Sequence, residues 1–114
     1  MNFGNRLDLC IDQGATFTQQ LTIKADDGNN IVGIETSDLR GQIRTDYDSS
    51  TVAGSFTFAW VDHAEGVADM TLSATVSAAI AGGNYVYDVE LALANGTVYR
   101  IMEGRVKVRP EVTR

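Results

Sequence analysis

The sequence predicts an all-β protein, built as an antiparallel β-sandwich of about seven or eight strands. Three observations indicate this fold. Apolar and polar residues alternate with a period of two along most of the chain. Clusters of glycine, asparagine and aspartate separate the alternating runs, about every 8–12 residues. The only proline, Pro110, lies beyond the expected strand interiors, so no strand loses a backbone donor there.

The alternation assigns most of the strands in order along the chain. The expected turns between them are rich in residues that tolerate positive φ. Phe56, Phe58 and Trp60 share one parity and are expected to supply much of the core. The expected strands are residues 7–11, 15–23, 39–44 and 56–60, with a further strand starting near 70; the turns are 26–30, 45–50 and 62–66.

One segment departs from the alternation. Val76 and Ile80 lie four residues apart among alanines and serines, which is a helical spacing. We expect one short helical turn near residues 75–81, ended by Gly82 or Gly83.

Composition limits both the size and the chemistry of the protein. With 114 residues and 44% apolar residues, the chain fits a single β-sandwich domain spanning residues 1–114. It has one cysteine, so no disulfide can form within the chain. We expect Cys10 to be buried or half-buried, because Leu9 and Ile11 flank it.

The charge argues against several classes of partner. The net charge is −6 and the isoelectric point is about 4.5, whereas nucleic-acid binding and polybasic membrane binding need a basic face. No apolar run approaches the roughly 20 residues of a membrane helix. The first residues lack the basic and apolar regions of a signal peptide. We therefore expect a protein made in the cytoplasm, with no nucleic-acid or membrane partner.

Asn95-Gly96 joins two alternating runs and predicts a two-residue type I′ turn, in which both central residues have positive φ. This turn sets the register of the closing hairpin. Tyr87 then lies opposite Gly104, where the missing side chain makes room for the ring. The apolar face of the hairpin carries Tyr85, Tyr87, Val89, Leu91, Leu93, Val98, Met102 and Val106.

The same register places Asp88 opposite Glu103, and like charges across a ladder repel. We expect Arg105, or an arginine from another strand, to bridge the two carboxylates, or a bulge near Gly104 to shift the register. A solvated pair beside Arg105 is the simplest interpretation, and a metal site or catalytic dyad is the alternative. Arg100 falls on the apolar face, opposite Leu91, and is expected near the hairpin tip with its head group in water.

Residues 81–87, "AGGNYVY", resemble the tyrosine corner of immunoglobulin-like sandwiches. Tyr85 takes the place of the tyrosine whose hydroxyl bonds to upstream backbone. Tyr87 takes the place of the second cysteine of antibody domains. The sandwich is therefore expected to be immunoglobulin-like, without the disulfide.

No motif for catalysis or cofactor binding is found. His63 is the only histidine and lies in a turn with Asp62 and Glu65, a pattern typical of a solvated loop. Residues 26–30, "DDGNN", lack the spacing of a calcium-binding EF-hand loop. We expect no catalytic residue, no metal and no cofactor, and hence no enzyme.

The remaining chemistry lies on the surface. A sheet edge with free N–H and C=O groups can pair with another chain, and the last strand is basic and continues toward the end of the chain. Residues 110–114 are expected to act as a C-terminal docking segment. The candidate interface residues are Tyr99, Ile101, Arg105, Lys107, Arg109, Pro110, Val112 and Arg114.

Four stretches together resemble a known family: "IDQGATFTQQLTI", "LRGQIRTDYDSSTV", "AGGNYVYDVEL" and "GTVYRIMEGRVKVRPEVTR". In this order they resemble small virion structural proteins of tailed bacteriophages, and the immunoglobulin-like N-terminal domain of phage baseplate upper proteins. The chain departs from the pattern at "NIVGIETSDL", which replaces a D-L-T-G phrase, so the second loop is expected to differ.

The resemblance implies a non-enzymatic structural or adaptor subunit of the virion, made in the bacterial host. It would be tail-associated, at the baseplate, neck or fibre attachment. Its partners would be other virion proteins and copies of itself. Two alternatives stay open: a capsid decoration protein on the head exterior, and a host-glycan-binding module using Trp60, Tyr47 or Tyr99.

Overall fold

The computed structural model describes residues 6–25 and 27–112 of the chain. Almost all of its regular structure is β, as the alternation predicts. A 3-10 turn, η1 (Ile34–Thr36), and one short helix, α1 (Ala74–Ala78), are the exceptions. The strands are β1 (Leu9–Asp12), β2 (Phe17–Thr22), β3 (Asp38–Arg44), β4 (Val52–Asp62), β5 (Val67–Leu72), β6 (Gly83–Ala92) and β7 (Val98–Arg109).

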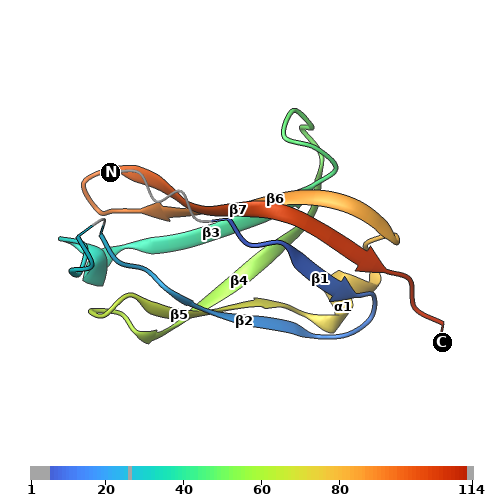
Figure 1. Cartoon of the computed structure of the whole chain (residues 1–114), viewed down its shortest axis with the longest axis horizontal. Coiled ribbons are helices and arrows are strands. Elements are labelled where there is room, and N and C mark those ends of the chain that lie inside the picture. The colour runs from blue at the N-terminus through green and yellow to red at the C-terminus, as the bar shows by residue number, and fades with distance from the viewer. Residues whose placement is uncertain (1–5, 26, 113–114) are drawn as a thin grey trace.

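The strands form two layers that share β4 (Figure 1). The hydrogen-bonded order is β1-β7-β6-β3-β4-β5-β2. The first half of β4 pairs with β3 up to Phe56, and its second half pairs with β5 from Thr57 onward. β3, β6 and β7 thus form one layer, and β2, β5 and the end of β4 form the other, as in immunoglobulin domains. The predicted fold class, an immunoglobulin-like β-sandwich, is confirmed.

The pairing of β1 differs from the expected antiparallel scheme. β1 runs parallel to β7, with Leu9 beside Val106 and Ile11 beside Val108. The last strand is therefore an inner strand rather than a free edge. The edges of the hydrogen-bonded order are β1 and β2, which follow one another in the sequence.

The core fills the space between the two layers. Phe56 and Tyr87 are its large aromatic members, with ring centroids 5.9 Å apart and an edge-to-face angle of 73°. Phe58 and Trp60 share the parity of Phe56 as predicted, but they are only half-buried at its margin. The fully buried aliphatic residues include Ile11, Ile34, Ile43, Met70, Leu72, Val89, Leu91, Val106 and Val108.

The turn of the β6–β7 hairpin is one residue longer than predicted. Gly96 has a φ of 92°, but no non-glycine residue among those described has a positive φ, so Asn95 does not adopt the type I′ conformation. Gly96 N–H donates to the Leu93 carbonyl oxygen at 3.0 Å, and Leu93 N–H donates to Thr97 at 2.8 Å. This is a type I turn followed by a left-handed glycine, the usual three-residue loop.

A bulge then restores the predicted register. Leu91 pairs with Tyr99 near the tip, one residue away from the expected partner, whereas Val89 pairs with Met102 as predicted. The extra residue on β7 is Ile101, and the pairing beyond it is the predicted one, with Tyr87 opposite Gly104. The register prediction is therefore right for the inner half of the hairpin and wrong for the outer half.

Two local predictions need correction. Cys10 is exposed, not buried, because its neighbours Leu9 and Ile11 both point inward on a strand. The helix is shorter than the predicted turn and starts one residue earlier. The Ser73 side chain, as its N-cap, accepts a hydrogen bond from Val76 N–H, and the helix ends at Ala78 with Ala79 as its C-cap, before the two glycines.

The tyrosine corner has the expected hydrogen bond. The Tyr85 hydroxyl donates to the Ala81 carbonyl oxygen at 2.7 Å. Tyr87, two residues later, is 1% exposed and fills the space between the layers. An aromatic ring thus occupies the position where antibody domains place a cysteine.

Candidate interaction surface

The basic residues predicted on β7 lie on its outer face. Arg105, Lys107 and Arg109 alternate with buried valines and are all exposed. Arg109 pairs with Asp12 of β1, while no carboxylate among the described residues lies within ion-pair distance of Arg105 or Lys107. Two cations on this face are therefore available to a partner.

The outer half of β7 does not supply the predicted contact residues. Ile101 is 3% exposed, because the bulge turns its side chain into the core, so its assignment to an interface is wrong. Tyr99 is half-buried and packs against the core cluster.

The C-terminal segment is attached to its own domain. Pro110 packs against Gly82, and Glu111 N–H donates to the Gln13 side-chain oxygen at 2.9 Å. Val112 is 93% exposed, and Arg114 lies outside the described residues. Part of the predicted docking segment therefore also has a structural role.

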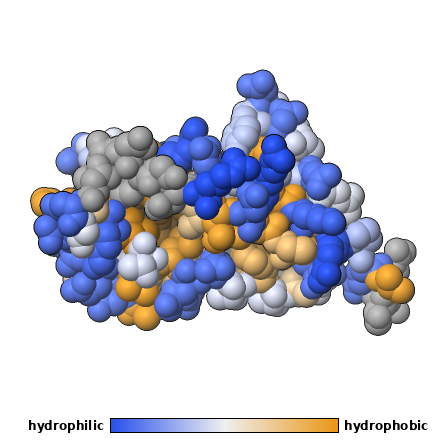
Figure 2. Space-filling view, viewed as in Figure 1, coloured by the Kyte–Doolittle hydropathy of each residue, from blue (hydrophilic) through white to orange (hydrophobic). Residues whose placement is uncertain are grey.

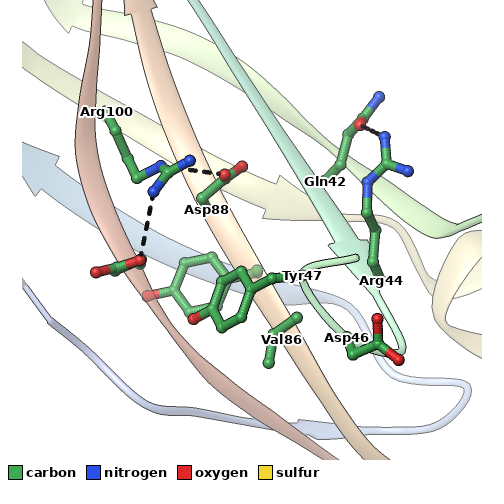
Figure 3. A pocket seen from close by; sticks show the side chains of 9 residues that line it. Gln42, Arg44, Asp46, Tyr47, Val86, Asp88 and Arg100 are labelled. Atoms are coloured by element: carbon green, nitrogen blue, oxygen red, sulfur yellow. Dashed lines mark hydrogen bonds and ion pairs between the residues drawn. The ribbon is translucent and has the colours of Figure 1, made fainter. Parts of the chain in front are cut away.

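Arg100 is the arginine that bridges the two facing carboxylates. Its Nε lies 3.4 Å from Asp88 Oδ2, and one of its terminal nitrogens lies 3.8 Å from Glu103 (Figure 3). The bulge at Ile101 makes this possible, since it moves Arg100 to the outer face that carries both acids. An arginine thus bridges the two carboxylates, but the predicted identity is wrong: it is neither Arg105 nor an arginine from another strand, and Arg100 does not lie on the apolar face.

These groups line a shallow hollow of about 360 Å³ on the outer face of β3, β6 and β7. Gln42 and Arg44 come from β3, and Tyr47 and Asp46 come from the loop that follows it (Figure 3). The ion pairs within the hollow are solvent-accessible, so they contribute little to stability and leave the site polar.

The Asp88 carboxyl responds most to this environment. Partial burial raises its pKa above the usual value, and the Arg100 guanidinium acts in the opposite direction. Glu90 and Glu103 add to the increase through charge repulsion. Arg100, and to a smaller extent Arg44, therefore offset part of the increase in the Asp88 pKa.

The loop between β3 and β4 projects beyond the layer (Figure 1) and is held by Arg44. One Arg44 nitrogen donates to the Ser49 carbonyl oxygen at 2.8 Å, and another donates to Gln42 at 2.8 Å. The side chain of Tyr47 on this loop is 54% exposed. Of the three aromatic residues considered for glycan binding, Tyr47 is the one that is exposed.

Trp60 packs against a residue of the turn that follows its own strand. Its ring stacks on His63 with centroids 4.0 Å apart and an interplanar angle of 18°. His63 also lies 3.4 Å from the Ser37 hydroxyl, so it is not a freely solvated loop residue.

Within residues 6–25 and 27–112, no three acidic, histidine or cysteine side chains gather as a metal site. No helix in that part of the chain could cross a membrane.

The β1 edge is protected against pairing. It has only four residues, and Asp8 and Asp12 lie at its two ends. The hydrogen bond from Arg109 lowers the pKa of Asp12, so this residue stays charged. Short length and charged side chains are common protections of an edge strand.

The β2 edge has none of these protections. Its six residues, "FTQQLT", include no charge and no proline, and they pair with β5 without a bulge. The Ile23 N–H donates to the carbonyl oxygen of Gly66. The direction of the backbone groups alternates along a strand, so the odd-numbered residues of β2 direct their N–H and C=O groups toward β5. The N–H and C=O groups of Thr18, Gln20 and Thr22 therefore point away from the sheet. Only the Gln20 carbonyl has a described partner, the amide of Gln19 at 3.1 Å.

A groove of about 270 Å³ follows this edge, and it is lined by apolar residues together with the polar side chains of Arg6, Gln19, Gln20 and Thr22. Figure 2 shows hydrophobic surface along the opening between the layers, flanked by hydrophilic residues. Leu21 and Ile23 line the groove on one side, and Ile101 and Met102 line it on the other. A strand added to β2 would cover this surface.

Sequence reasoning did not identify Arg100 or the β2 edge as parts of the surface. The adjacent apolar residues Ile101 and Met102 interrupt the alternation and could have indicated the bulge. The absence of charge from residues 17–22 is visible in the sequence. That these residues form an edge strand depends on the strand order.

Comparisons with known proteins concern the fold. No family model matches the chain, and no curated protein matches it in sequence. CopC from Methylosinus trichosporium OB3b is 14% identical, with a TM-score of 0.47, over 93% of this chain and 89% of that chain. The ZIG-8–RIG-5 IG1–IG1 heterodimer is 9% identical, with a TM-score of 0.44, over 96% of this chain and 87% of that one. At these values neither likeness supports an argument about function.

Proposed function

We propose that the chain is a non-enzymatic structural or adaptor subunit of a tailed-bacteriophage particle. It is tail-associated and joins its neighbours through a sheet edge. The sequence resemblance supplies the setting, and the unprotected β2 edge is the observation that carries the docking role. A six-residue edge without charge, proline or bulge suits addition of a strand from another protein.

The exposed end of β7 supplies a second contact. Arg105 and Lys107 stand side by side on the outer face without an acidic partner among the described residues. On a protein with a net charge of −6, such a local basic pair favours an acidic surface on a neighbouring subunit. These cations would set the orientation of the contact, while β2 supplies its backbone hydrogen bonds.

Immunogold labelling of purified particles, from the phage that encodes this chain, tests the setting. Label on the tail is expected. Label on the head alone would favour the decoration role instead, and particles without label would overturn the assignment to a virion.

A pair of variants tests the docking edge in the same particles. Gln20→Lys places a charge on the β2 edge and should abolish incorporation. Thr71→Lys adds the same charge one strand further in, next to Thr18, and should leave incorporation unchanged. If both variants are incorporated like the wild type, β2 is not the docking edge.

A further inference from the structure

We propose that the strand added to β2 is β2 of a second copy of this chain, antiparallel across a two-fold axis. Gln20 then lies opposite Gln20 of the second copy. The inference rests on the proposed function, because it names the partner of the same edge. It makes the smallest assembly unit a dimer in which the β2–β5 layers of two copies form one continuous sheet.

The backbone fixes which residues can meet. Thr18, Gln20 and Thr22 present both N–H and C=O groups to the free side of β2, as the pairing of Ile23 with Gly66 requires. With Gln20 opposite itself, Thr18 lies opposite Thr22 of the second copy. Each of these pairs can exchange two hydrogen bonds. A two-fold contact therefore uses every outward backbone group of the strand.

The side chains on the exposed face fit the same register. Thr18, Gln20 and Thr22 are exposed and uncharged, and each can both donate and accept hydrogen bonds. An edge of this kind is complementary to itself, which is what a two-fold contact demands. The Gln19 amide now bound to the Gln20 carbonyl would give way to a backbone N–H of the second copy.

The inner face is also continuous across the axis. Phe17 lies opposite Ile23 of the second copy in this register; Phe17 is partly buried at the margin of its core, and Ile23 is buried within it. Phe17 would thereby add apolar surface to the groove beside Leu21. A register shifted by one residue would place inner residues opposite exposed ones.

Electrostatics favour this edge as the place where two copies meet. Each copy carries a net charge of −6, so most approaches of two copies are repulsive. β2 brings no charge to the contact. β1 would place Asp8 and Asp12 of one copy near the same residues of the other. Association through β2 therefore avoids the acidic residues that guard the other edge.

Sedimentation of the purified full chain tests the proposal. The wild type should show a concentration-dependent equilibrium between monomer and dimer. Gln20→Lys and Gln20→Glu should each weaken the dimer about tenfold or more, because like charges then face each other across the axis. An equimolar mixture of the two variants should form a heterodimer at least as tight as the wild type.

The controls separate the possible failures. Thr71→Lys should dimerise like the wild type, and all variants should keep the wild-type circular dichroism spectrum. A wild type that stays monomeric up to millimolar concentration, or a mixture that does not recover dimer, overturns the self-pairing. If such a monomer is still incorporated into particles and loses incorporation on Gln20→Lys, β2 docks a different protein and the proposed function stands.

Discussion

The hydroxyl of Tyr87 donates a hydrogen bond of 2.5 Å to the carbonyl oxygen of Leu7, which lies eighty residues earlier in the sequence. The bond ties the segment before β1 to the middle of the sandwich. Burial raises the pKa of the Tyr87 hydroxyl well above its usual value, so the group remains a donor at all ordinary pH values. Tyr87 therefore fills the core and also positions the N-terminal segment.

Removing this hydroxyl should destabilise the fold. Tyr87→Phe keeps the ring but leaves the Leu7 carbonyl without its donor, at a cost of about 1–3 kcal/mol in the free energy of unfolding. Urea denaturation measures the change. Tyr85→Phe is the matched comparison: its bond to Ala81 is exposed, so the loss should be about 0.5–1.5 kcal/mol. Equal effects of the two substitutions would contradict the structural role of the Leu7 contact.

Gly104 should be intolerant of any side chain. A Cβ atom at this position would overlap the Leu7 backbone, which cannot move without losing its bonds to Tyr87 and Glu103. We expect Gly104→Ala to cost about 1–3 kcal/mol. Arg105→Ala, the neighbouring exposed position, should change stability by less than about 0.5 kcal/mol. Thermal melts of both variants measure these changes. A wild-type melting temperature for Gly104→Ala would show that the Leu7 backbone can move to accept the added side chain.

The pairing of Tyr87 with Gly104 was predictable, but its purpose was not. The sequence indicates that the missing side chain makes room, and the structure shows that the Leu7 backbone uses that room. The reason is topological. The parallel pairing of β1 with β7 joins residues nearly a hundred positions apart, and alternation within a strand carries no information on such partners.

The hairpin tip shows a second limit of sequence reasoning. Asn95-Gly96 indicates a hairpin correctly, yet the dipeptide fits both a two-residue and a three-residue loop. The structure adopts the longer loop, and the bulge at Ile101 compensates for it. The register of the inner half of the hairpin therefore follows from the hydrophobic pattern. The burial of Ile101 and the position of Arg100 on the outer face depend instead on the bulge. Cys10 is the opposite case: its predicted burial was wrong, although the alternation with Leu9 and Ile11 was enough to place it on the outer face.

Replacing Arg100 should make stability depend more strongly on pH. Arg100→Gln leaves Arg44 as the remaining cation that acts on Asp88, which still faces Glu103, so the pKa of Asp88 should rise further above its usual value. At neutral pH the variant should lose about 0.5–1 kcal/mol.

The sign follows from linkage. A folded-state pKa above the unfolded one means that the folded state binds the proton more tightly, so stability rises as pH falls through the raised pKa. The deficit of Arg100→Gln should therefore shrink between neutral pH and the usual Asp range near 4. Urea denaturation over this pH range measures it. A deficit that does not change with pH would mean that Arg100 acts through packing alone.

Deleting residues 110–114 separates docking from support of the domain. The deletion removes the contact of Pro110 with Gly82 and the hydrogen bond from Glu111 N–H to Gln13, whose amide also donates to Ile80 at 2.9 Å. We expect the chain to fold with a loss of about 1–2 kcal/mol, because one partly buried hydrogen bond and one small apolar contact disappear. Circular dichroism and a thermal melt measure this, and immunogold labelling measures incorporation. Glu111→Pro removes the N–H donor together with the Glu111 side chain but keeps the rest of the segment, so it controls for the support. If Glu111→Pro melts like the deletion and is incorporated into particles while the deletion is not, residues 110–114 dock a neighbour. Normal incorporation of the deletion variant would mean that residues 110–114 only support their own domain, through the contact with Gln13.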